Sequence, residues 1–121
     1  MSANQKVTPY RNLDVDETGV VVSASPCKLS SAYIYNTSAT DLYLKMYNKS
    51  TAATSADTPI ATYVVPTRSG LVFNFIHREL PFNDGMSIRA TTAIADNDTG
   101  APAANSIVVN INTVENLSYT L

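Results

Sequence analysis

The sequence predicts an all-β domain, a two-sheet antiparallel sandwich of seven to nine strands with either a jelly-roll or an immunoglobulin-like arrangement. Only 15% of the 121 residues are charged, while Thr, Ser and Asn, which suit strands and turns and disfavour helix interiors, are common. Several short runs alternate apolar and polar side chains, and no stretch keeps helical spacing beyond two turns. Turn-forming segments separate these runs, as in a sandwich or barrel.

The alternating or β-branched runs are expected as strands over residues 19–25, 28–36, 42–48, 60–65, 71–76, 86–92 and 106–114, with residues 117–121 as a further edge strand. The clearest period of two falls in residues 42–48, where one face carries Leu42, Leu44 and Met46 and the other carries Tyr43, Lys45 and Tyr47. Such alternation predicts one face in the core and one in water.

The same rule assigns faces to the other strands. In residues 28–36, one face is expected to hold Leu29, Ser31, Tyr33 and Tyr35, and the opposite face Ala32 and Ile34. In residues 71–76, the inward side chains are Leu71, Phe73 and Phe75, expected at the centre of the core.

The last two strong runs follow the same pattern. Residues 86–92 are expected to point Met86, Ile88 and Ala90 inward and Ser87, Arg89 and Thr91 outward. Residues 106–114 send Ile107, Val109 and Ile111 inward, and Asn110 and Asn112 outward.

The segments between strands are rich in Ser, Thr, Ala, Pro and Gly, and residues 49–59 and 95–104 form the two longest predicted loops. Residues 1–12 show little apolar periodicity. They are predicted as an N-terminal arm that is ordered only where something else holds it, which leaves one domain over residues 13–121.

Charge and cysteine content exclude several classes of function. The net charge is −2 and the eight basic residues are scattered, so no basic stripe is available for nucleic acid. No run of eighteen apolar residues exists to span a membrane. The polar first ten residues lack the apolar stretch of a secretory signal. Cys27 is the sole cysteine, which excludes an internal disulfide and fits synthesis in a reducing cytoplasm.

No catalytic pattern stands out, and the chain is expected not to be an enzyme and to carry no cofactor. His77 is the only histidine; it would need Glu79 as a partner to act as a general base, and a polar strand end is the simpler interpretation. Neither a G-x-S-x-G nucleophile motif nor a glycine-rich phosphate loop occurs. Cys27 has no nearby cation cluster that would lower its pKa, so a buried, inert thiol is expected.

Two acidic segments, residues 14–19 and 96–100, alternate oxygen-bearing side chains with a glycine at the end. Calcium needs six to eight oxygens, and neither segment has the bidentate glutamate that ends an EF-hand loop. Turns in which Asp and Asn bond their own backbone explain both segments, so no metal site is predicted.

The tyrosines suggest an interface, because tyrosine presents flat apolar area with a polar tip. The candidate interface residues are Val7, Tyr10, Tyr33, Tyr35, Tyr43, Tyr47, Tyr63 and Tyr119. Cross-strand pairing within the sheet would explain the strand tyrosines equally well. The same rings could also stack on sugars, so they do not separate protein partners from glycans.

Within residues 32–98, the segments 33–40 (YIYNTSAT), 42–49 (LYLKMYNK), 57–59 (DTP), 65–67 (VPT), 80–85 (LPFNDG) and 91–98 (TTAIADND) resemble small virion-associated proteins of tailed bacteriophages. Members of that group with an assigned role look like capsid cement (decoration) proteins or β-sandwich modules attached to heads and tails. The resemblance implies a structural protein on the capsid surface of the virion, made in the host bacterial cytoplasm, with the major capsid protein as its partner.

The expected function is therefore a cement protein that binds the outer surface of the major capsid protein lattice and stabilises it. Because such modules usually form closed symmetric contacts, self-association as a dimer or trimer is expected. The alternative is a glycan-binding or host-attachment module of a phage head or tail fibre.

Overall fold

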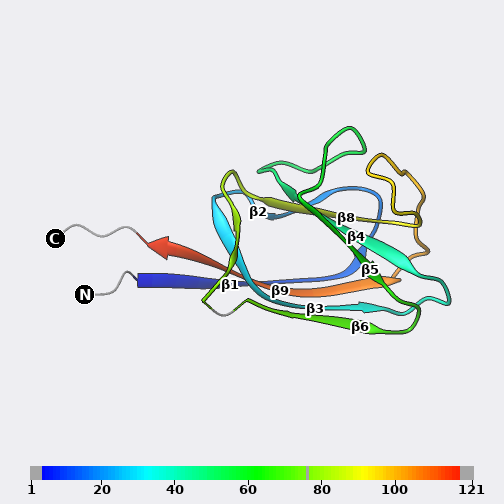
Figure 1. Cartoon of the computed structure of the whole chain (residues 1–121), viewed down its shortest axis with the longest axis horizontal. Helices are drawn as coiled ribbons and strands as arrows, with labels where there is room; N and C mark the ends of the chain where they lie inside the picture. The colour runs from blue at the N-terminus through cyan, green and yellow to red at the C-terminus, as the bar shows by residue number, and fades with distance from the viewer. Residues whose placement is uncertain (1–3, 76, 118–121) are drawn as a thin grey trace.

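The computed structural model describes residues 4–75 and 77–117, which form nine strands and no helix (Figure 1). In chain order the strands are β1 (Asn4–Val15), β2 (Val20–Ser23), β3 (Cys27–Asn36), β4 (Leu42–Asn48), β5 (Ala61–Val65), β6 (Gly70–Asn74), β7 (Leu80–Phe82), β8 (Met86–Thr91) and β9 (Ile107–Leu117). They make two antiparallel sheets, so the predicted all-β sandwich is confirmed.

The strand order is that of a jelly roll. Sheet A has the order β1-β9-β3-β6, with β7 pairing β3 further along the same edge, and sheet B has the order β2-β8-β4-β5. Among the described strands, β4 and β5 are the only consecutive pair that hydrogen-bond to each other; most other connections cross between the sheets. This matches an eight-stranded jelly roll whose sixth strand is split into β6 and β7, and it differs from the immunoglobulin order.

The core lies between the two sheets, and nearly all of the predicted inward residues form it. The buried cluster includes Leu42, Leu44, Met46, Met86, Ile88, Ala90, Ile107, Val109 and Ile111, together with Val15, Leu29, Ile34, Val65 and Phe82. Nine-tenths or more of each of these side chains is removed from water, the condition under which apolar burial contributes about 1.5–3 kcal/mol per residue.

The predicted inward residues of β6 and of the position after it do face inward, but they lie at the margin of the core. Leu71, Phe73 and Phe75 are half-buried and pack against the buried cluster. Phe73 contacts the ring of Tyr63 on β5 at a centroid distance of 4.6 Å. The prediction that Phe73 lies at the centre was wrong because β6 is an edge strand, with a neighbour on one side only.

The face assigned to Leu29 was also wrong. Leu29 is fully buried, on the same side as Ala32 and Ile34, while Tyr33 points outward. The register between β3 and β9 shifts between Leu29 and Ser31. The bulge inserts one extra residue there, and one extra residue exchanges the two faces of a strand.

Most of the predicted N-terminal arm is part of the sheet. Residues 4–12 belong to β1, which pairs antiparallel with β9 from Asn4↔Leu117 onward, so they are held by the otherwise open edge of β9. Because β3 pairs with β9 only as far as Val114, the start of β1 and the end of β9 continue as a two-stranded ribbon beyond the sandwich (Figure 1). Among the described residues, no helix is long and apolar enough to cross a membrane.

Candidate functional site

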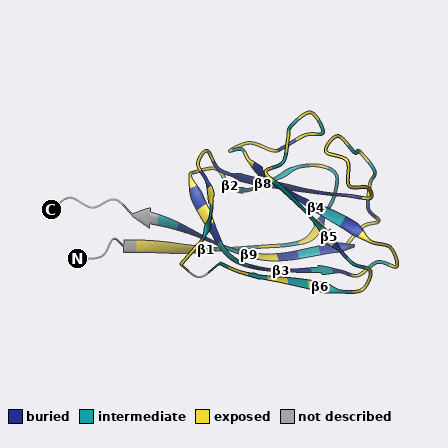
Figure 2. Ribbon diagram, in the orientation of Figure 1, coloured by how far each residue is buried: buried dark blue, intermediate teal, exposed yellow. Residues whose placement is uncertain are grey.

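The two outer faces of the sandwich differ, and the difference decides which face is open to a partner. On sheet B, the outward side chains of β8 are Ser87, Arg89 and Thr91, and all three are buried (Figure 2). Lys45 and Tyr47 of neighbouring β4 are buried as well. The prediction of a wet face here was wrong, because the long loops on this side fold over the sheet.

Arg89 connects these loops to the sheet. The residue is only 1% exposed, and its guanidinium donates hydrogen bonds to Glu17 O (2.8 Å), Asp98 O (2.8 Å) and the hydroxyl of Tyr47 (3.0 Å). Two of these acceptors lie in different loops, before β2 and after β8. One buried cation therefore fixes two loops against β8 through charge-assisted hydrogen bonds.

Lys45 repeats this arrangement on β4. Its ammonium is fully buried and donates to the carbonyl oxygens of Ala93 and Ala95 in the loop after β8. Burial lowers the pKa of Lys45 from its ordinary value, and the charge of Arg89 lowers it further. Together the two cations hold the loops over sheet B, and this face is closed to a large ligand.

The outer face of sheet A, in contrast, is not crossed by any loop of the described residues (Figure 1). A shallow groove of about 540 Å³ runs over β9, β3 and β6. We call it the sheet A groove; its outward side chains are Ser31, Tyr33, Val72, Asn74, Asn110 and Asn112. None of its lining residues is charged, so the groove suits a neutral partner surface.

Tyr33 is the aromatic residue at the centre of the sheet A groove, and neighbouring residues hold its ring in place. It lies opposite Val72 on one side and opposite Asn110 on the other. Its ring stacks on Tyr35 at a centroid distance of 6.4 Å, and the Tyr35 hydroxyl donates to Arg68 O (3.2 Å).

Gly70 leaves room for the ring of Tyr33. A Cβ atom at position 70 would lie 2.8 Å from the Tyr33 hydroxyl, closer than real Cβ contacts allow. The tyrosine is thus held against the sheet while 44% of it stays exposed. A rigid, half-exposed aromatic ring is typical of an interface anchor.

The structure brings only some of the predicted interface residues together. Tyr33 and Tyr35 share the open face of sheet A. Tyr10 and Tyr63 pack against the core, Tyr47 is buried under Arg89, and Tyr43 is half-buried on sheet B. Val7 is exposed on β1. Tyr119 lies outside the described residues.

The sequence did not indicate which residues surround Tyr33 in the groove. Val72 is 74% exposed, and the amides of Asn74 and Asn110 are exposed beside it. The outward position of Asn110 was predicted, but nothing in the sequence indicated that it would lie next to Tyr33. Asn110 and Val72 lie on either side of Tyr33 because β3 pairs with β9 along one edge and with β6 along the other.

The carboxylates of the two acidic segments, residues 14–19 and 96–100, bond to the backbone of their own loops. Asp16 accepts a hydrogen bond from the Thr18 amide (2.9 Å), and Asp98 accepts from the amides of Ala93 (3.1 Å) and Gly100 (3.0 Å). These are the side-chain-to-backbone turns that the sequence predicted. Within residues 4–75 and 77–117, no three His, Cys, Asp or Glu side chains gather as a metal site requires.

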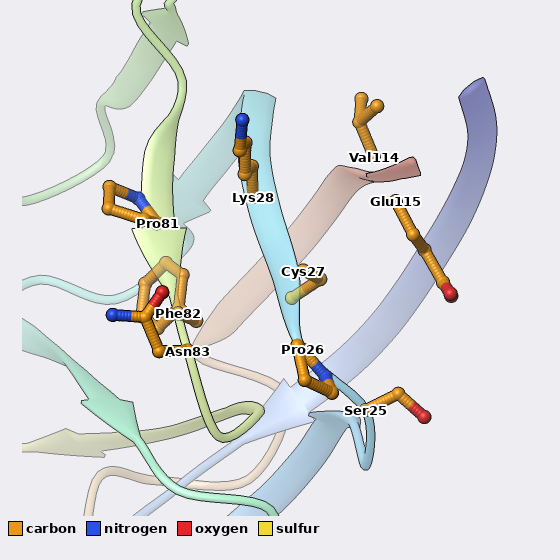
Figure 3. A pocket seen from close by; sticks show the side chains of 9 residues that line it. All are labelled: Ser25, Pro26, Cys27, Lys28, Pro81, Phe82, Asn83, Val114 and Glu115. Atoms are coloured by element: carbon orange, nitrogen blue, oxygen red, sulfur yellow. The ribbon is translucent and has the colours of Figure 1, made fainter. Parts of the chain in front are cut away.

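A second pocket, of about 370 Å³, lies where β3, β7 and β9 meet, beside Cys27 (Figure 3). Burial raises the pKa of the Cys27 thiol, although a hydrogen bond with Ser23 opposes the shift. In Figure 3 the ends of Lys28 and Glu115 point in different directions and do not converge on the sulfur. A thiol with a raised pKa is a poor nucleophile, so this pocket lacks the chemistry of a cysteine site.

His77 follows β6 in an exposed turn with left-handed backbone (φ 66°). The adjacent amide of Arg78 donates to Phe75 O (2.9 Å), which closes the turn. This placement agrees with the prediction of a polar residue after a strand.

No family model and no curated protein match the sequence. Among solved structures, one from work on Bacillus endospore appendages, a novel family of disulfide-linked pili, is similar to this chain with a TM-score of 0.43 and 17% identity, over 95% of this chain and 92% of that chain. A likeness of this size carries no argument about function.

Proposed function

We propose that the chain is a structural, non-enzymatic virion protein, a capsid decoration protein that binds the outer surface of the major capsid protein lattice. The phage origin and the capsid partner rest on the resemblance of residues 32–98 to virion-associated phage proteins. The observation that supports the proposal most is the open outer face of sheet A, with the anchored ring of Tyr33 at its centre.

The groove has the features of a protein-binding patch. Its middle holds an aromatic and an aliphatic side chain, Tyr33 and Val72, and its margin holds the neutral polar groups of Asn74, Asn110 and Ser31. Interfaces commonly have this composition, with apolar anchors inside a polar rim and few charges. The closed face of sheet B leaves the loops as the surface that would point into solvent on a particle.

The proposal is tested by binding of the purified chain to capsids that lack it. Tyr33→Ser should lower the affinity about 30-fold, since truncating an interface anchor costs about 2 kcal/mol or more. Ile94→Ser is the matched control, because Ile94 is a large apolar residue that is exposed on the loop side, over sheet B. Equal loss of binding for both variants, or no binding by the wild-type chain, would refute the proposal.

A second candidate is a glycan-binding module, and the same groove is the observation that favours it. A flat aromatic ring flanked by amide and hydroxyl groups can stack on a sugar and hydrogen-bond its hydroxyls. Binding to a glycan array that Tyr33→Ser abolishes, together with no affinity for capsids, would support this function over the first.

A further inference from the structure

The edge of sheet A at β6 presents unpaired backbone groups. At either end of this strand, the amide of Asn36 donates to Ser69 O (3.0 Å) and the amide of Phe75 donates to Ser30 O (2.9 Å). Backbone groups alternate in direction along a strand, so Leu71 and Phe73 also pair with β3. The N–H and C=O groups of Gly70, Val72 and Asn74 therefore point away from the sheet.

The residues of β6 itself do not protect this edge. Edge strands are usually blunted by charges, proline or bulges, and β1 at the opposite edge carries Lys6, Pro9 and Arg11. Strand β6 has none of these: it reads GLVFN and pairs with β3 without a register shift. Over residues 58–75, Arg68 in the preceding turn is the only charged residue.

The same side of the sandwich is also apolar. Strands β5 and β6 are the edges of sheet B and sheet A on this side. Ile60, Val64 and Val72 are exposed there, and Phe73 and Tyr63 are only half-buried between the two edges. A strand of another chain can pair with such an open edge strand and at the same time cover the exposed apolar side chains.

We infer that β6 pairs antiparallel with β6 of a second copy of this chain, about a two-fold axis at Val72. In this register Val72 faces Val72, Gly70 faces Asn74, and Leu71 faces Phe73 of the partner copy. About six backbone hydrogen bonds would form between the copies. No like charges meet, and the half-buried apolar margin of each core is covered by the other copy.

A second copy fits this edge because the strand is complementary to itself. The outward residues Gly70, Val72 and Asn74 form a small–apolar–polar series that runs in opposite directions on the two copies, so no two bulky side chains and no two charges face each other. A two-fold contact of this kind closes after two copies and leaves β6 no free edge. It also places the two sheet A grooves next to each other on one face.

A charge swap at the axis tests this pairing. Val72 is 74% exposed, so Val72→Lys and Val72→Glu should leave the fold of each copy intact. Each variant alone sets two like charges against each other and should weaken the dimer at least about tenfold. An equal mixture of the two variants should form a heterodimer, which native mass spectrometry separates from either homodimer by mass.

The matched control is Val7, an exposed valine on the opposite edge strand. Val7→Lys and Val7→Glu should both dimerise like the wild-type chain. A single cysteine tests the register independently: residues facing each other at the axis lie about 5.5 Å apart between Cα atoms. A disulfide spans roughly 4.4–6.8 Å, so Val72→Cys should cross-link under mild oxidation and Val7→Cys should not.

A wild-type chain that stays monomeric at its highest soluble concentration in light scattering would overturn the inference. So would a trimer, or a dimer that Val72→Lys leaves unchanged. These measurements use the purified chain alone, so their outcome is independent of capsid or glycan binding.

Discussion

Replacing Arg89 by methionine should release the loops that cover sheet B. Methionine keeps most of the length and apolar stem of arginine but removes its donors. Three acceptors then lose their partner: Glu17 O, Asp98 O and the Tyr47 hydroxyl. Each unsatisfied group costs about 1–3 kcal/mol, with the lower value for loop carbonyls that water can reach. We expect a loss of about 3 kcal/mol in the free energy of unfolding.

A domain of this size loses about 4 °C in Tm per kcal/mol, so Arg89→Met should melt about 10–15 °C below the wild-type chain. Circular dichroism at 218 nm would follow heat and urea unfolding, and an unchanged urea m-value would show that the unfolded reference is the same. Arg78→Met is the control, because Arg78 is exposed and should change stability by no more than about 0.5 kcal/mol. A Tm for Arg89→Met within about 3 °C of wild type would refute the reasoning, because the three hydrogen bonds of a buried arginine cannot be lost at so small a cost.

Three further perturbations test other parts of the structure. Phe73→Ala should stay folded, with a loss of about 2–3 kcal/mol by urea unfolding, since Phe73 is half-buried; an insoluble variant would place it deeper in the core. Gly19→Ala should cost about 1–3 kcal/mol and expose residues 52–55 to hydrogen exchange, because the new Cβ would lie 2.0 Å from Ala53 O; wild-type protection of that loop would contradict the contact. Burial raises the pKa of Cys27 above 9.0, so the unfolded chain loses that proton first and the stability due to Cys27 falls as pH rises above 9. Cys27→Ala should flatten this alkaline loss in urea titrations from pH 8 to 10, and an equally steep loss in both chains would exclude the thiol as its cause.

The sequence indicated most of the core because core contacts follow from periodicity within each strand. Leu42, Leu44, Ile88 and Val109 lie where alternation places them. Leu29 does not, because the bulge at Ser30 depends on the register with β9, and one strand's own sequence contains no information on its partner's register. The first residues of β1 could not be predicted as a strand for a similar reason, because these polar residues are ordered by pairing with the edge of β9 more than by burial.

The outer layers were the least predictable part of the molecule. Lys45 and Arg89 occupy outward positions, and their burial comes from loops that are distant in sequence. The sheet A groove has the same origin, since Tyr33, Val72 and Asn110 come from three strands that meet only in the folded sheet. Tyr33 itself was identified from its residue type and alternation. Which residues lie beside Tyr33 could not be predicted from the sequence, because this depends on the jelly-roll strand order.

Cryo-electron microscopy of particles assembled with this chain would show directly whether it acts as a surface-bound structural module. We predict a jelly roll at every equivalent lattice position, with Tyr33 and the open face of sheet A against the major capsid protein and the loops over sheet B in solvent. Capsids without this density, or density confined to the tail, would contradict the proposed role.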